Sequence, residues 1–245
     1  MTDQMTSAPP AQLLRGQLNN LRKSRRNQDF VFTSEDRTKM GATAVAAGLA
    51  GLGGIATGLS AMAMDTTEQA DLLEFELDGK SVKAWVWQSV FEEGDEVEVV
   101  AEQWGNGWQG YGIRRTKDKI VALHPHCSRG RYAHYRSTIR WWLKIGLSLN
   151  LFMYLLVAGI VLFGSYPNLI GIVEMCILGG LGVMAILGVI AARVSGKMMG
   201  FVRLAEGVFQ GFGWTDVKNI DLPAITMKSK QPGDPGALGV LYFRY

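Results

Sequence analysis

The side chains best suited to chemistry lie together at residues 123–142, in the stretch LHPHCSRGRYAHYRSTIRWW. This stretch holds all three histidines of the chain and one of its two cysteines, at His124, His126, Cys127 and His134. Imidazole nitrogens and thiolates bind zinc and copper well, so these four residues are the candidate metal ligands. Their spacing fits no standard zinc finger, and no second ligand cluster supports them. We therefore expect a strand end and a turn at a membrane surface, with no metal and no cofactor.

Sequence motifs of enzyme active sites are absent. The chain has no phosphate-binding glycine loop of the P-loop type, no nucleophile elbow and no HExxH helix. The triplet Gly105-Asn106-Gly107 predicts a turn and not a dinucleotide-binding fingerprint. A serine–histidine pairing around Ser128 is left open, but no other residue supports it. We expect no catalytic residue and no enzymatic activity.

Three long runs of nearly uncharged residues indicate the class of protein. They cover residues 41–64, 145–164 and 169–192, in a chain whose residues are 48% hydrophobic and only 19% charged. Each run has about the 20 residues that a helix needs to cross roughly 30 Å of hydrocarbon. The second and third runs are separated only by Ser165-Tyr166-Pro167-Asn168, so they predict a transmembrane helical hairpin over 145–192. The alternative is a pair of buried core helices in a soluble protein, but such helices are usually shorter.

The first run differs because it is built mainly from glycine and alanine. Its small residues recur at four-residue spacing and include Gly48, Gly51, Gly54 and Gly58. Such spacing lets helix backbones approach closely in lipid, where packing drives association. Residues 34–64 therefore predict a membrane helix or a re-entrant segment, and a half-flexible loop is the alternative.

Basic residues flank all three runs, and this pattern is inconsistent with three simple crossings. By the positive-inside rule, the flanks before the first run, before the second and after the third would all lie in the cytoplasm. The hairpin satisfies the rule for the last two flanks and leaves the first run as the misfit. That run is either re-entrant or interfacial, or it is translocated against its charge, which a chain delivered from outside the target bilayer could tolerate.

The basic residues just before the second run are interleaved with aromatic ones. Aromatic rings at headgroup level beside Arg and Lys form an interfacial anchor, which we expect over residues 128–144. The expected anchor residues are Arg129, Arg131, Arg136, Arg140, Trp141, Trp142 and Lys144. The other basic segment, residues 1–33, has no apolar core of a cleavable signal peptide, and we expect it to be mobile.

Alternating apolar and polar residues predict a small β-domain over residues 70–127. The turn signal Asp78-Gly79 separates two alternating runs, and residues 104–108 predict a second hairpin. Five short strands in this length favour a small closed barrel of the OB or SH3 kind between the first and second membrane segments. Such barrels often bind nucleic acid, but the strands here carry many carboxylates that would repel phosphate, so we expect no nucleic-acid partner.

Two polar residues lie within the apolar helices, and a further amphipathic segment follows them. Glu174 and Asn150 are candidates for an ion path, although Glu174 also lies close enough to the start of its helix to stay near the headgroups. Residues 193–245 predict an amphipathic helix in the membrane interface and a C-terminal strand that docks on the barrel or on a partner. The expected apolar face of that helix contains Met198, Phe201, Val202, Ala205, Val208 and Phe209. The predicted fold class is therefore an α+β membrane protein with about three membrane-inserted helices.

Four segments of the sequence resemble a family of bacterial proteins described as type VI secretion system effectors. They are DFVFTSEDRTKMGATAVAAGLAGLGG, ADLLEFELDGKSVKAWVW, FEEGDEVEVVAEQW and IVALHPHCSRGRYAHYRSTIRWW, which together lie within residues 29–144. The resemblance implies a protein that a contractile injection machine delivers to a neighbouring Gram-negative cell, where it acts on the inner membrane. It also implies a tube protein or chaperone as carrier and a cognate immunity protein as a partner. No catalytic residue can be transferred from the family.

Together, the residues and the resemblance predict a homo-oligomeric pore in the inner membrane. The lipid bilayer would be its main partner, the Gly/Ala run and the hairpin would pack in the oligomer, and Glu174 would lie near the conducting path. The alternative, from a different class, is a resident inner-membrane protein whose barrel is an interaction module.

Overall fold

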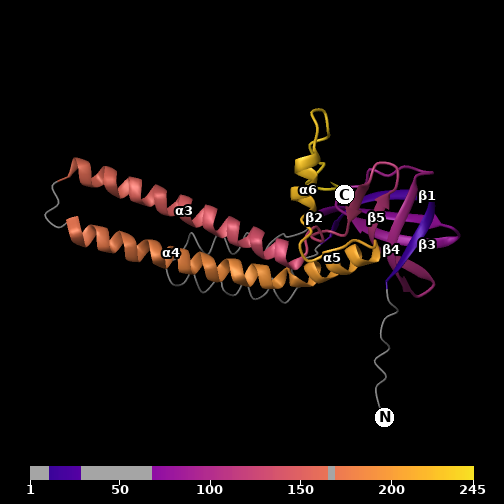
Figure 1. The fold of residues 1–245 in the computed structure, drawn as a ribbon, viewed down its shortest axis with the longest axis horizontal. Coiled ribbons are helices and arrows are strands. Elements are labelled where there is room, and N and C mark those ends of the chain that lie inside the picture. The colour runs from indigo at the N-terminus through magenta and orange to yellow at the C-terminus, as the bar shows by residue number, and fades with distance from the viewer. Residues whose placement is uncertain (1–10, 29–67, 165–168) are drawn as a thin grey trace, which may run out of the picture.

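The computed structural model describes residues 11–28, 68–164 and 169–245. A globular part at one end contains the strands and two short helices, and a pair of long helices extends from it (Figure 1). The predicted Gly/Ala segment, with Gly48, Gly51, Gly54 and Gly58, lies outside the described residues. Of the expected membrane segments, the structure therefore bears only on the hairpin.

The strands form one sheet that closes on itself. Its order is β3-β2-β1-β4-β5-β6-β7, and a parallel pairing of β3 with β5 closes the first five strands into a barrel. The predicted small closed barrel is thereby confirmed, with β6 and β7 added beyond β5. The strands are β1 Gln12–Gln28, β2 Glu68–Leu77, β3 Lys80–Val86, β4 Glu96–Trp104, β5 Gly107–Arg115, β6 Ile120–Leu123 and β7 Phe243–Arg244.

Strand β1 corrects, for residues 12–28, the expectation of a mobile segment over residues 1–33. Its 17 residues pair antiparallel with β4 through the first half and with β2 through the second half. Leu14 and Leu18 point into the barrel core, while basic residues outside meet carboxylates of the neighbouring strands, as in Arg15–Glu98 at 3.0 Å. The positive charge of β1 thus complements the acidic strands. A basic segment that looks solvated in sequence is here a central strand.

Two hydrophobic clusters share the sheet between them. The first fills the barrel and includes Leu73, Phe75, Phe91 and Ile113. The second lies between the outer face of the sheet and the helices that follow the hairpin. Val99 belongs to the first cluster and its neighbour Val100 to the second, because successive strand residues point to opposite faces. Strand β4 is therefore buried on both sides and anchors the two clusters to each other.

The short helices α5 Met199–Gly211 and α6 Leu222–Ser229 belong to the second cluster. Val202, Ala205, Val208 and Phe209 of α5 are buried there. The amphipathic helix was predicted correctly, but its predicted contact with the membrane interface is wrong, because its apolar face packs on the barrel. The C-terminal strand does dock on the barrel, where β7 pairs with β6.

A buried ion cluster closes one end of the barrel. The side chain of Arg115 is only 11% exposed, and its Nη1 and Nη2 lie 2.7 Å from Asp95 Oδ2 and from Asp118 Oδ2. Burial of Asp95 opposes its ionisation, but hydrogen bonds from the Glu92 backbone, Arg115 and Lys117 outweigh it, and the pKa of Asp95 is lowered to about 2. Ionised Asp95 therefore stabilises the folded barrel.

We predict that Asp95→Asn lowers stability at neutral pH but much less in acid. A carboxylate with a depressed pKa stabilises the fold above its unfolded pKa and loses that contribution as pH falls, here between about 4 and about 2. At pH 7 the cost should be about 2 kcal/mol, from a shift of nearly two pKa units. Thermal unfolding of the intact chain in detergent, measured at pH 7 and pH 2.5, checks this. Glu92→Gln, on an exposed side chain, is the control. An equal difference in stability between the wild type and Asp95→Asn at the two pH values would contradict the prediction.

Candidate functional site

Among the residues that the structure describes, almost nothing covers the two long helices. Helices α3 Arg131–Phe163 and α4 Leu169–Lys197 contain 33 and 29 residues, about 50 Å and 44 Å at 1.5 Å per residue. Both are long and apolar enough to span a membrane, yet only 11% and 6% of their most apolar windows are buried. The core helices of a soluble protein would be covered. The predicted hairpin over 145–192 lies within these two helices.

Polar contacts hold α3 and α4 together near the globular part. His134 Nε2 lies 2.9 Å from Ser195 Oγ, and the indole Nε1 of Trp142 donates to the carbonyl oxygen of Met184 at 3.1 Å. Trp142 was predicted as a headgroup anchor, but its polar atom faces the partner helix. These bonds fix the register of the hairpin close to where its helices leave the barrel.

Farther along the hairpin, small residues let the helices approach closely. Gly180 is buried, and a methyl group on it would overlap the side chains of Tyr154 and Asn150. Asn150 donates from Nδ2 to Gly146 O at 2.8 Å, while its Oδ1 has no hydrogen-bond partner among the described residues. Asn150 therefore fills the seam between α3 and α4.

Glu174 and Asn150, the predicted ion-path residues, do not meet. Asn150 faces Gly180, whereas Glu174 precedes Gly180 by six residues and so lies about 240° around α4 and about 9 Å along it. Glu174 is exposed and forms no ion pair with any residue that the structure describes. Within one chain, the two polar groups do not build a common path.

The first turns of α3 are joined to the C-terminal part by acidic partners. Glu206, buried in α5, accepts from the backbone N–H, Nε and Nη2 of Arg131 at 2.8, 3.1 and 2.9 Å. Burial opposes ionisation of Glu206, but the bonds from Arg131 prevail and lower its pKa. Arg131, which was expected at the lipid headgroups, connects the hairpin to the barrel part through this pair.

The remaining predicted anchor residues divide between two environments. Arg129 Nε lies 3.0 Å from Asp221 Oδ1, and Arg136 Nη2 donates to Asn219 Oδ1 at 2.9 Å. In contrast, Arg140, Trp141 and Lys144 lie exposed on α3, with the Lys144 ammonium 5.4 Å from the Trp141 ring centre. Within this second group, Arg140 Nε donates to the Arg136 carbonyl oxygen at 3.4 Å, and the three exposed side chains can contact headgroups.

The four candidate metal ligands have separate partners. His124 stacks on Phe201 of α5, and His126 Nε2 lies 2.7 Å from Glu68 Oε2. Burial lowers the pKa of His124 and raises the pKa of the Cys127 thiol. His134 lies on α3 and contacts Ser195 instead. Among the described residues, no group of three or more His, Cys, Asp and Glu could hold a metal ion.

The His134–Ser195 pair has the composition of a base and a nucleophile, but its surroundings do not complete such a site. Ser195 is buried in the interior of α4, and no described carboxylate bonds His134 to orient it. Helical N–H groups are used in the helix itself and cannot form an oxyanion hole. The pair therefore serves as a contact between helices, which sequence reasoning missed because the partners lie 61 positions apart.

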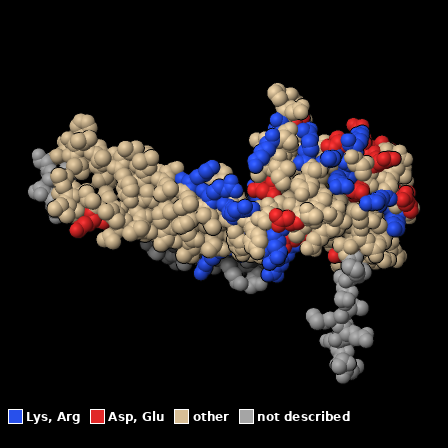
Figure 2. Space-filling view, viewed as in Figure 1, with Lys and Arg blue, Asp and Glu red and all other residues tan. Residues whose placement is uncertain are grey.

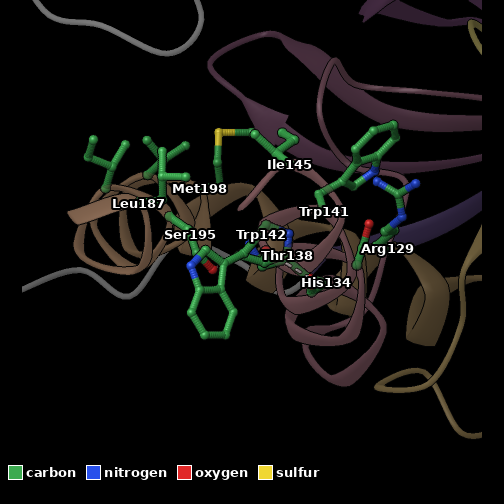
Figure 3. Close-up of a pocket in the computed structure, with 13 residues that line it drawn as sticks. Arg129, His134, Thr138, Trp141, Trp142, Ile145, Leu187, Ser195 and Met198 are labelled. Atoms are coloured by element: carbon green, nitrogen blue, oxygen red, sulfur yellow. Dashed lines mark hydrogen bonds between the residues drawn. The ribbon is translucent and has the colours of Figure 1, made fainter. Parts of the chain in front are cut away.

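A groove opens where α3 and α4 leave the globular part (Figure 3). It has a volume of about 370 Å³. Arg129, Ser137 and Trp141 lie at its polar end and also line a second hollow that contains Arg140 and Lys144. Ile145, Leu187 and Val194 belong to its apolar wall. Its residues come from both helices, so the groove depends on the register of the hairpin.

The junction between hairpin and barrel part tolerates no added atom at Gly130. A methyl group there would overlap the Val217 carbonyl oxygen and lie 2.7 Å from the carbonyl carbon of Lys218, both backbone atoms. Its φ of −76° suits alanine, so only the contact opposes substitution. We predict that Gly130→Ala destabilises the protein by about 1–3 kcal/mol, as overpacking does.

Gly207→Ala in α5 is the matched control for Gly130→Ala. Nothing lies within 4 Å of its added methyl group, and alanine favours a helix. Thermal unfolding in detergent should therefore show a loss for the first variant and no loss for the second. Equal melting temperatures for the two variants would contradict a close contact at Gly130.

Comparisons of the chain with protein-family models, with curated proteins and with solved structures gave no match. None of them identifies the secretion-effector family that the sequence resembles. The function therefore has to be inferred from the geometry and chemistry of the hairpin and of its junction with the barrel.

Proposed function

We propose that the chain is a membrane-anchored protein whose barrel part is held at one face of a bilayer by the α3–α4 hairpin. The observation that carries the proposal is the apolar surface of two helices that are only 11% and 6% buried over their most apolar windows. Exposed to water, such surface costs about 25 cal/mol per Å², whereas hydrocarbon accommodates it. The hairpin therefore requires lipid or an equally apolar partner.

Charge supports one orientation of this anchor. Basic residues gather where the hairpin joins the globular part, and the shaft beyond them is nearly free of charge (Figure 2). Both helix ends at that side carry them, at Arg140 and Lys144 on α3 and at Arg193 and Lys197 on α4. The positive-inside rule then favours a cytoplasmic barrel, and the resemblance to bacterial secretion effectors favours the inner membrane of a Gram-negative cell as the membrane of the hairpin.

The length of α3 supports the depth of insertion. About 20 residues cross the hydrocarbon, so the first third of this helix lies outside it. That division puts Trp141 and Lys144 at headgroup level, where aromatic and basic side chains are favoured. The junction with the globular part is then at the bilayer surface.

The barrel supports a role as an interaction module. The closed ring runs β1-β2-β3-β5-β4, with the parallel β3–β5 closure, and this order favours an OB-type barrel over an SH3-like one. Trp104, at the turn between β4 and β5, is 78% exposed. Because exposed aromatic residues are enriched where proteins meet, this turn is the candidate contact with a partner protein.

We predict that the protein stays in membranes after alkaline extraction. We also predict that the tip of the hairpin and the barrel part face opposite compartments. In a variant without Cys127 and Cys176, a cysteine at Gly164, the hairpin tip, should react with an impermeant maleimide in intact spheroplasts. A cysteine at Gln231 should react only after the membrane is opened. Release of the protein at alkaline pH, or labelling of both positions from the same side, would reject the anchor.

A second candidate function is the pore of a secreted effector. The observation that favours it is Glu174, a carboxylate exposed on the apolar surface of α4 without an ion-pair partner among the described residues. Such a group in a bilayer usually marks a proton or ion path or meets a partner. A second copy of the chain could supply that environment, and a carrier protein and an immunity protein would then be further partners.

We predict that, if the pore forms, Glu174→Gln changes ion selectivity or abolishes conductance in planar bilayers. The reason is loss of the only described charge in the outer part of α4. Glu92→Gln, which alters an exposed barrel residue, should leave conductance unchanged. Absence of current from the wild-type protein, with no growth arrest after periplasmic targeting, would reject the pore and leave the anchor untouched.

A further inference from the structure

The groove at the base of the hairpin changes in character along its length. Arg129, Ser137 and Trp141 lie at one end, while Ile145 and Leu187 line the part that extends along the hairpin. In Figure 3 the side chains of Arg129 and Trp141 lie next to each other, away from Leu187. One continuous surface thus has a cationic and aromatic end and an apolar end.

The cationic end carries more positive charge than the nearby carboxylate offsets. Arg129 donates a hydrogen bond from Nε to Asp221 Oδ1, and its two terminal nitrogens bond no described residue. Arg140 and Lys144 line the adjoining hollow and form no ion pair with a described carboxylate. From Lys119 to Val173 the sequence contains no Asp or Glu. The balance favours a ligand with negative charge.

The position of the groove in the anchored protein determines what kind of ligand can reach it. This step depends on the proposed membrane insertion of α3 and α4. Trp141 and Lys144 then lie at headgroup level, and Leu187, which packs beside Gly146 of α3, lies at the start of the hydrocarbon. A free phosphate would leave the apolar wall uncovered, and a water-soluble peptide would have to enter lipid. A phospholipid presents an anionic head and an apolar chain in this same order.

We infer that this groove and the adjoining hollow bind a single anionic phospholipid, with its phosphate at Arg129, Arg140 and Lys144 and one acyl chain along Ile145 and Leu187. Ser137 lies where the two hollows meet and offers a hydroxyl to the headgroup. Trp141, 59% exposed, covers the glycerol region from the side. The hairpin base is thus a lipid-specific site as well as an anchor.

The test is lipid retention by the full-length protein in detergent with added dioleoyl phosphatidylglycerol or dioleoyl phosphatidylcholine, measured by native mass spectrometry. The wild type should keep one phosphatidylglycerol in preference to phosphatidylcholine. Each basic residue at an anionic surface strengthens attraction roughly fivefold, so Arg140→Gln with Lys144→Gln should weaken retention roughly 25-fold. Arg193→Gln with Arg203→Gln removes the same charge from α4 and α5, at residues that line neither the groove nor the adjoining hollow, and should change retention little.

A steric variant tests the groove separately from charge. Ser137→Trp fills the point where the hollows meet and keeps every basic residue, so it should also lose the retained lipid. Equal loss in the groove and control pairs, or retention unchanged by Ser137→Trp, would overturn the site. Alkaline extraction of each variant separates the two proposals: a protein that stays in membranes without lipid preference rejects the groove alone, and one that is released rejects the anchor.

Discussion

The contact between the start of α3 and the C-terminal part is the constraint on which the rest of the molecule depends. Gly130 touches the backbone at Val217, and Arg131 gives three hydrogen bonds to buried Glu206. Removing one member of a buried charged pair is costly, because the other is left without compensation. Close backbone contact and paired charge together fix the point and direction at which the hairpin leaves the barrel. That direction sets the positions of the groove, of the basic end of α4 and of Trp141 relative to the barrel part.

The same junction is relevant to the basic residues that flank all three apolar runs, a pattern that is inconsistent with three simple membrane crossings. Gln28 at the end of β1 and Glu68 at the start of β2 are cross-strand partners, so the chain leaves and re-enters the barrel at one place. Glu68 also contacts His126, five residues before Arg131, which places that exit beside the hairpin base. In the proposed anchor, the two described helices satisfy the positive-inside rule, because the described basic flanks lie at the end of the hairpin that joins the barrel part.

The hairpin and most barrel strands could be predicted because their signals are local. A run of apolar residues as long as 169–192, or the alternation around Asp78-Gly79, depends on neighbouring residues only. Strand β1 could not be found in this way, because its outer face is basic and its carboxylate partners, such as Glu98, are distant in sequence. For α5 the amphipathic pattern was recognised but its partner was not. An apolar helix face looks the same whether it packs on lipid or on a sheet, and only the buried Glu206 distinguishes them.

The candidate site shows the same limit. The basic and aromatic residues around Trp141 were visible in the sequence, whereas the apolar wall of the groove comes from α4 and depends on the register set by His134–Ser195 and Trp142–Met184. No sequence signal gives that register, since antiparallel helices of this length could slide by a turn. The three His residues and Cys127 show that closeness along the chain does not by itself bring side chains to one point.

The packing inside the hairpin also decides where any conducting path would lie. Trp142, Asn150 and Gly180 close the seam between α3 and α4, so within one chain no water path is expected along it. A path between copies would be lined by the exposed faces of these helices, which are apolar except near Glu174. Such a path would carry one ring of carboxylates at the end farthest from the barrel, and its long apolar remainder would resist wetting. The polar and basic side chains of the hairpin are instead concentrated at its base, where a headgroup can reach them. This distribution favours an anchor over a pore.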